Sequence, residues 1–418
     1  MSDELLSMKL PDTSVDLYNY LLPEANIAQF PAENRENSRL LLATSEPFNI
    51  TRFSDIGKHI PDNSLLIFNE TRVIPARLVF LKPTGARIEV FLLHPIAPAD
   101  YQEALSAYGS TEWKVLIGNA AKWKGGDLNI VFCVETGSEI IFTATRTGPE
   151  TVRFSWHHHI SFGSILDHLA QVPLPPYIHR SNNETDRERY QTVFARNEGS
   201  VAAPTAGLHF TEKLLHELTA SGIQQVALTL HVGLGTFRPV KDSIANHTMH
   251  NEPFYISHEQ LKMLAGNAAR PWTVVGTTSL RALESLYTYG CKLLNKTETE
   301  KVEFEIAQWD KWNSTESEGV NRQKVFETLL ALSEKHGSTG LSGNTSLIIL
   351  KGKPVRTADY LITNFHQPKS TLLMLVDAFA SVNWTEAYQY ALSQNMRFLS
   401  YGDACLFRNK NSVVAFEE

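Results

Sequence analysis

Short segments of alternating hydrophobic and polar residues follow one another between residues 75 and 155. Turns containing glycine separate them, and the segments are 87–93, 113–117, 128–134 and 139–145. Regularly spaced short strands joined by glycine turns are typical of a small antiparallel barrel or sandwich. We therefore predict an inserted antiparallel β-barrel domain at 75–155.

The rest of the chain alternates apolar runs with helical patterns. Apolar runs occupy 225–232, 272–276 and 358–363, and helical spacing of hydrophobic residues occurs at 211–218 and 370–379. This alternation favours an α/β fold, with a mixed and largely parallel sheet. Residues 1–74 and 156–418 should form this discontinuous α/β domain. The polar stretch 287–343, around one helical pattern at 324–332, is interpreted as a surface excursion.

Composition limits the class of protein. The 418 residues are 43% hydrophobic and 20% charged, which suits a globular protein of two or three domains. The net charge of −7 provides no overall attraction for a polyanion, so a nucleic-acid site must be a local basic patch. The N-terminus lacks the basic start of a signal peptide, and no apolar run approaches about 18 residues. We expect a soluble, cytoplasmic protein without membrane contact.

Three loops share one layout, in which a strand ends in glycine and polar residues before a helix begins. They are AAPTAGLHFT at 202–211, GTTSLR at 276–281 and TNFHQPKST at 363–371. In a parallel sheet such loops meet at the carboxyl ends of the strands, where ligands bind, and helix starts present free N–H groups. The alternative interpretation is structural: ordinary helix caps would be formed by Thr211, Ser279 and Ser370.

The segment LHVGLGTFRPV at 230–240 also leaves a strand through glycines. It is not a dinucleotide fingerprint, because the third glycine is missing and a proline would interrupt the following helix. Two interpretations stand: a tight turn, or close approach of the backbone to a ligand. The second would use Gly233 and Gly235, with His231, Thr236 and Arg238 as polar groups.

Metal chemistry and several enzyme classes are not expected. The histidines at 157–159, 247 and 250 lack an acidic residue at a familiar ligand spacing, and the three cysteines lie far apart. Phosphate-binding-loop, nucleophile-elbow and H-E-x-x-H motifs are absent. Segments 175–180 and 186–190 mix basic and aromatic residues as RNA-binding segments do, although Glu184, Asp186 and Glu188 neutralise much of that charge.

Nine segments, in order, carry a resemblance to a known family. They are 68–77 (FNETRVIPAR), 175–178, 190–194, 199–210, 231–240, 249–252, 275–284, 363–376 and 400–403 (SYGD). Together they resemble the S-adenosylmethionine:tRNA ribosyltransferase-isomerase family, over residues 18–407. The resemblance implies an α/β domain interrupted by a small β-barrel.

The resemblance also implies the reaction. S-Adenosylmethionine is a consumed co-substrate whose ribosyl part is transferred to 7-aminomethyl-7-deazaguanine at the tRNA wobble position and isomerised. Epoxyqueuosine forms, and adenine and methionine leave. The implied partners are the tRNAs for Asp, Asn, His and Tyr. No permanently bound cofactor or metal is implied, and a monomer is expected.

Departures from the family pattern bear on the substrate. The stretch 287–343 is long, 350–356 replaces a Pro-Gly-Tyr-like turn, Gln367 replaces a leucine and Glu70 an aspartate. Two other functions therefore stay open. One is a homologue with lost activity or an altered RNA substrate. The other is a nucleotide-binding enzyme acting on a free small molecule.

The implied reaction needs a base for the carbon beside the sulfonium, a proton donor for adenine and a site that excludes water. The candidate acids and bases are His209, His231, His366 and Asp403, with their individual roles unassigned. Substrate contacts are expected from Thr205, Gly233, Gly235, Arg238 and Asn364. A methionine carboxylate or tRNA phosphate is expected at Thr278, Ser279 and Arg281, or at Lys369 and Ser370. Two further arginines, Arg72 and Arg77, would also bind such an anionic group, or would hold the inserted domain against the main domain.

Overall fold

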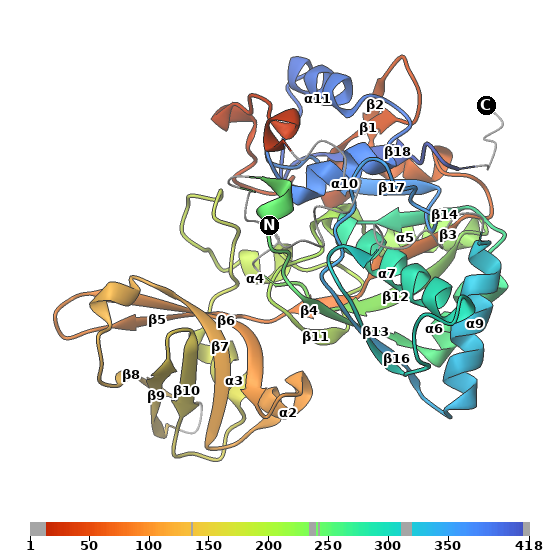
Figure 1. Cartoon of the computed structure of the whole chain (residues 1–418). Coiled ribbons are helices and arrows are strands. Elements are labelled where there is room, and N and C mark those ends of the chain that lie inside the picture. Colours follow the sequence, from red (N-terminus) through yellow and green to blue (C-terminus); the bar gives the residue numbers. More distant parts are fainter. Residues whose placement is uncertain (1–13, 135–136, 234–239, 241–242, 311–319, 413–418) are drawn as a thin grey trace.

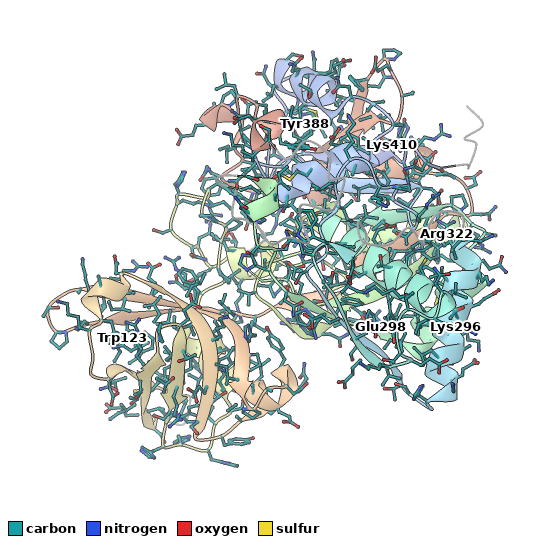
Figure 2. The ribbon with its side chains drawn as sticks, in the orientation of Figure 1. Trp123, Lys296, Glu298, Arg322, Tyr388 and Lys410 are labelled. Carbon is teal, nitrogen blue, oxygen red and sulfur yellow. The ribbon has the colours of Figure 1, made fainter. Side chains whose placement is uncertain are left out.

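The computed structural model describes residues 14–134, 137–233, 240, 243–310 and 320–412. The chain forms a large body of helices packed on a sheet, and a smaller body of strands that projects from one side of it (Figure 1). Figure 2 shows Trp123 in the smaller body and Tyr388 at the opposite end of the larger one. Both side chains are buried, so each body has a core of its own.

A ten-stranded sheet forms the centre of the larger body. Its strands, in spatial order, are β15 (Glu303–Ile306), β16 (Gly340–Thr345), β13 (Glu252–Ser257), β12 (Gln224–Leu230), β3 (Leu65–Asn69), β14 (Trp272–Val275), β17 (Tyr360–Asn364), β18 (Ala404–Arg408), β1 (Arg39–Ala43) and β2 (Asn49–Arg52). The central strands β12, β3, β14 and β17 are parallel to their neighbours within this group. The expected strands at 225–232, 272–276 and 358–363 are thus all present.

Both faces of this sheet are covered. Every residue of β3 is buried, with Leu65 and Ile67 packed in one hydrophobic cluster and Leu66 and Phe68 in another. Such uninterrupted burial is typical of strands between two helical layers. The first cluster includes α6 (His258–Gly266), α7 (Thr277–Leu294), α9 (Arg322–Lys335), α10 (Thr371–Phe379) and α11 (Trp384–Ser393). The second includes η4 (Phe53–Lys58) and α5 (Glu212–Ala220).

The smaller body is a six-stranded antiparallel sheet. Its order is β5 (Arg77–Leu81), β6 (Arg87–Ala97), β7 (Ser110–Gly118), β10 (Thr151–Ser155), β9 (Glu139–Gly148) and β8 (Leu128–Cys133). The edge strands β5 and β8 approach each other, which nearly closes a barrel. Helices α2 (Tyr101–Ser106) and α3 (Phe162–Leu169) contribute to its core. The expected fold class, a mixed α/β sheet with an inserted antiparallel barrel, is confirmed.

A short parallel ribbon, β4 (Thr71–Val73) with β11 (Asn197–Ser200), lies between the two bodies. The chain enters the barrel after β4 and returns through α3 and α4 (Asp186–Arg189) (Figure 1). The main chains of Arg77 and Gln171 bond to each other in both directions at this passage. The segment that enters the barrel and the segment that returns from it are therefore hydrogen-bonded to each other at the passage between the two bodies.

The expectation of a surface excursion at 287–343 is wrong for its described residues. Tyr287, Tyr289 and Cys291 are buried in α7, because that helix continues to Leu294. Strands β15 and β16 extend the central sheet, and α9 packs against α6 and α7. The polar composition reflects the outer faces of these elements, whose inner faces join the main core.

Candidate active site

A cavity lies at the carboxyl ends of β12, β14 and β17. The structure brings together five of the predicted residues in its lining: Thr205, Thr278, Asn364, His366 and Ser370. The three loops singled out in the sequence therefore meet. Loops 276–281 and 363–371 follow the neighbouring parallel strands β14 and β17. Loop 202–211 follows β11 of the short ribbon, and it joins them because the N–H groups of Val201 and Ala202 donate to the carbonyl of Val232, which follows β12.

The amino end of α7 faces this cavity. Gly276 precedes the helix with φ of 89°, a backbone conformation that only glycine adopts easily. Thr277 and Thr278, in the first turn, line the cavity. Their N–H groups have no partner within the helix, and the helix dipole adds partial positive charge there. The helix cap is Gly276, so the expectation of a cap at Ser279 is wrong.

Among the described residues that line the cavity, His366 is the one histidine. Its Nε2 lies 2.9 Å from Oγ1 of Thr363, and its backbone N–H donates to the hydroxyl of Tyr388 over 3.0 Å. The hydroxyl of Tyr20 donates to its carbonyl. Burial lowers the pKa of His366 to about 3, because a buried imidazolium loses its hydration. The ring is thus neutral and fixed in position at neutral pH.

His209 lies behind the cavity wall and reaches it through Asn364. Nδ2 of Asn364 donates to Nε2 of His209 over 3.1 Å, so the proton of the neutral ring is on Nδ1, 2.7 Å from Oγ of Ser38. Burial lowers the pKa of His209 to about 4. Oδ1 of Asn364 is buried and has no hydrogen-bond partner among the described residues. This lining residue therefore has an unused acceptor.

Ser370 caps α10 and also lines the cavity. Its Oγ accepts the backbone N–H of Leu373 over 3.2 Å. Thr211 caps α5 in the same way, accepting from Leu214 over 3.1 Å. Ser370 is thus a helix cap that also lines the cavity, and its expected contact with a substrate stays a prediction, whereas Thr211 acts as a cap.

Two of the four candidate acids and bases are engaged elsewhere. The ring of His231 stacks on Tyr101 of α2, with centroids 4.8 Å apart, and this contact joins the barrel to the larger body. Asp403 is buried and accepts backbone N–H groups of Arg39 and Arg397, as well as Nε of Arg39 over 3.2 Å. Neither residue lines the cavity.

Other predicted cationic residues have protein partners. Arg281 forms a buried ion pair with Glu252, and burial lowers its pKa to about 10. Nζ of Lys369 lies 2.7 Å from a carboxylate oxygen of Asp16. Ser279 is fully buried in α7, and its Oγ has no partner among the described residues. Arg281, Ser279 and Lys369 are not part of the cavity lining.

Arg77 connects the barrel to the larger body. Its guanidinium bonds to Glu89 of β6 over 2.9 Å and to Asn182 over 3.0 Å. The geometry favours the interpretation of Arg77 as a fastening residue. Arg72 is exposed on β4. Gly233 does not line the cavity, and Gly235 and Arg238 lie outside the described residues.

Tyr177 and Ser400 also line the cavity, and the sequence did not single them out as site residues. The hydroxyl of Tyr177 lies 2.6 Å from Oγ of Ser400, and burial raises the pKa of the phenol. Both belong to segments that carry the family resemblance, 175–178 and 400–403, which was the available signal. Their contact joins positions 223 residues apart in the chain.

The described residues contain no group of three or more metal-binding side chains close enough to hold an ion. Within the same part of the chain, no helix has both the length and the apolar character needed to cross a membrane.

Comparison with known proteins gives the family. The profile of the "queuosine biosynthesis protein" family matches residues 15–407. The chain belongs to this family. Within it, the S-adenosylmethionine:tRNA ribosyltransferase-isomerase of Halothermothrix orenii is 38% identical over 94% of this chain and 99% of its own length. The protein of the same name from Syntrophomonas wolfei is 37% identical over 93% and 96%.

A crystal structure of the S-adenosylmethionine tRNA ribosyltransferase of Thermotoga maritima aligns with 93% of this chain and 99% of its own. The sequence identity is 24% and the TM-score is 0.43. The resemblance to the queuosine biosynthesis family expected from the motifs is confirmed by the profile and by the relatives.

Proposed function

We propose that this protein is an S-adenosylmethionine:tRNA ribosyltransferase-isomerase. It transfers the ribosyl part of S-adenosylmethionine to 7-aminomethyl-7-deazaguanine at the tRNA wobble position and isomerises it, forming epoxyqueuosine and releasing adenine and methionine. Full-length relatives of that name support the activity. The observation that carries it is the cavity at the strand ends, which unites loop residues of three family-matching segments.

The amino end of α7 is the proposed site for the carboxylate of the methionine part. Thr277 and Thr278 present free N–H groups at the positive end of the helix dipole, and a carboxylate there needs no further cation. This assignment fits the structure better than one that uses Arg281, because Glu252 already neutralises that side chain.

His366 is the proposed proton-transfer residue. The positive sulfonium makes the protons on its neighbouring carbon acidic, and a neutral imidazole accepts such a proton. His366 is neutral and lies in the cavity lining. The neutral ring is in the protonation state that a proton acceptor needs at neutral pH.

His209 and Asp403 are proposed as positioning residues. His209 holds the amide of Asn364, whose unused Oδ1 would accept an N–H of the substrate. Asp403 fixes Arg39 and Arg397 at the start of β1 and in the segment before β18. His231 and Arg77 would keep the barrel, residues 75–155, docked on the domain formed by 1–74 and 156–418.

The finer identity of the partner follows from the resemblance. We propose the tRNAs for Asp, Asn, His and Tyr as acceptors, a cytoplasmic location where such tRNAs are modified, and a monomeric enzyme without a permanently bound cofactor.

The test is a transfer reaction with two acceptors. Incubation with ribosyl-labelled S-adenosylmethionine and tRNA bearing the deazaguanine precursor, followed by digestion to nucleosides, should give a labelled modified nucleoside and one adenine per transfer. No label in the RNA and no adenine release would overturn the proposal. Equal transfer to the free base would favour an enzyme acting on a small molecule.

A further inference from the structure

A second, smaller hollow adjoins the cavity. Its lining includes Arg35, Arg189, His209 and Tyr401, and it shares Ser400 with the cavity. A chain of hydrogen bonds also connects the two spaces, since the Asn364 amide donates to His209, the ring contacts Ser38, and Ser38 Oγ donates to the carbonyl of Arg35 over 3.1 Å. The two spaces therefore meet at Ser400 and lie on either side of the Asn364–His209 pair.

Two guanidinium groups line this hollow, and backbone carbonyls hold both. Arg35 donates to the carbonyls of Leu208 and Glu188 over 3.2 and 3.0 Å. Arg189, at the end of α4, donates to the carbonyls of Glu33 and Ala32. Among the described residues neither arginine forms an ion pair with a carboxylate. Within the described part of the chain, Nε of Arg189 is buried and has no hydrogen-bond partner.

The two positive charges act on each other. Burial and the charge of Arg189 lower the pKa of Arg35, while the exposed carboxylate of Glu188 raises it by less. Two like charges at one hollow destabilise the empty site, and an anion bound between them relieves that repulsion. Arginine is the side chain best suited to phosphate, because its fork of donors matches two phosphate oxygens.

The surrounding carboxylates do not cancel these charges. Asp186 accepts two hydrogen bonds of 2.6 Å from Arg180, and Asp403 is engaged by Arg39 and Arg397. The carboxylate of Glu36 keeps its charge and is directed to the start of α5, where it accepts the hydroxyl of Thr211 over 2.8 Å. The side chains of Glu33 and Glu188 are exposed to solvent, which screens them.

An exposed aromatic ring stands next to the hollow. Phe30 is 56% exposed and directly precedes Pro31 and Ala32 of the lining. The guanidinium of Arg180 stacks on its ring at 4.4 Å from the centroid, which holds the ring in place. A fixed, exposed ring beside positive charge is the combination on which single-stranded RNA bases stack while their phosphates are neutralised.

We propose that Arg35 and Arg189 bind one backbone phosphate of the RNA substrate, beside the nucleotide whose base enters the cavity. This inference rests on the proposed function and adds the part of the acceptor that the second hollow recognises. It also accounts for an RNA enzyme with a net charge of −7, because the positive charge needed is local.

The test compares Arg189→Gln and Arg35→Gln with Lys262→Gln, which removes an exposed cation on α6, away from both hollows. The probe is an anticodon stem–loop RNA carrying the deazaguanine precursor, with binding followed by fluorescence anisotropy at several salt concentrations. Each arginine variant should bind about tenfold or more weakly. Its log–log salt slope should fall by about 0.7 to 0.9 for the lost phosphate contact. Lys262→Gln should match the unaltered protein.

Calorimetry with S-adenosylmethionine separates the two anions that the hollow could hold. Affinity for S-adenosylmethionine should change less than twofold in both arginine variants. A large loss for S-adenosylmethionine with unchanged RNA binding would overturn the proposal and place the methionine carboxylate at the hollow. Transfer with RNA by the unaltered protein serves as the separate test of the proposed function.

A second measurement alters the RNA and compares its effect in the unaltered protein with that in one variant. RNAs carrying a single neutral methylphosphonate at successive positions of the anticodon loop are bound to the unaltered protein. One position should weaken binding about tenfold, and that loss should vanish in Arg189→Gln, because the contact is already absent. Equal losses in both proteins would overturn the proposal.

Discussion

Asn364 and His209 form a hydrogen-bonded pair that connects the cavity to the buried interior. The amide Nδ2 donates to Nε2 of the ring over 3.1 Å, and this contact fixes which edge of the amide remains available. The available edge is Oδ1, which has no partner among the described residues. The orientation of a cavity-lining acceptor is thus set by a histidine that does not itself line the cavity.

Replacing Asn364 by leucine should lower kcat/KM by about 10- to 100-fold. The change removes the proposed substrate acceptor and leaves a buried nitrogen of His209 without its donor, which also costs about 1–3 kcal/mol of stability. Steady-state kinetics and urea unfolding measure the two effects. Asn344→Leu, at an exposed position of β16, is the matched control and should retain full activity. Normal activity of Asn364→Leu would remove this residue from the site.

Acid should destabilise the fold between pH 6.5 and about 4. Burial lowers the folded-state pKa values of His209 and His366 to about 4 and about 3, from an ordinary value near 6.5. The unfolded chain then binds more protons in this window. Stability is full above pH 6.5 and falls by up to about 1.4 kcal/mol per pH unit for each histidine.

Urea unfolding at pH 7.5, 6 and 5 checks this pH dependence, with His209→Gln and His366→Gln as comparisons. Each variant should lose part of the slope of stability against pH, since glutamine does not titrate. His216→Gln, on α5, serves as the control and should keep the slope of the unaltered protein. If both His209→Gln and His366→Gln kept the full slope of stability against pH, the two histidines would not be the cause of the acid destabilisation.

Arg281 and Glu252 should behave as a structural pair. Their ion pair is buried, so Arg281→Met or Glu252→Leu alone leaves one buried charge without its partner and should cost about 3–5 kcal/mol. The double variant Arg281→Met with Glu252→Leu should recover most of that loss. Thermal or urea unfolding of the three variants forms a double-mutant cycle. Losses that simply add would show that the pair does not couple.

Gly276→Ala should damage the site more than the fold. At φ of 89° and ψ of 144° an alanine is strained by about 1–3 kcal/mol, and its Cβ would lie 3.8 Å from Oγ1 of Thr278 at the start of α7. We expect weaker S-adenosylmethionine binding in calorimetry, with cooperative unfolding preserved. Gly222→Ala is a matched control, because that glycine also has positive φ but has no neighbouring atom within 4 Å of the added Cβ. Equal binding losses in both variants would contradict a role for the α7 start.

The central fold could be predicted because its signals are local. Strands β12, β14 and β17 are continuous apolar runs that end in polar loops, and the barrel strands alternate between glycine turns. The stretch 287–343 could not be predicted correctly. Its inner residues, such as Phe304, Ile306 and Leu341, are spread thinly among polar ones, and only their packing against the sheet reveals them.

The sequence by itself determined the family, the fold class and the loops that supply the cavity, because these depend on residue order and on hydrophobic periodicity. Tertiary structure decided which side chains in those loops are available. Asp403, Arg281 and His231 are all polar residues in family-matching segments, yet Arg39, Glu252 and Tyr101 engage them. A side chain's partner comes from wherever the fold brings a complementary group within a few ångströms. Separation along the chain does not encode that distance.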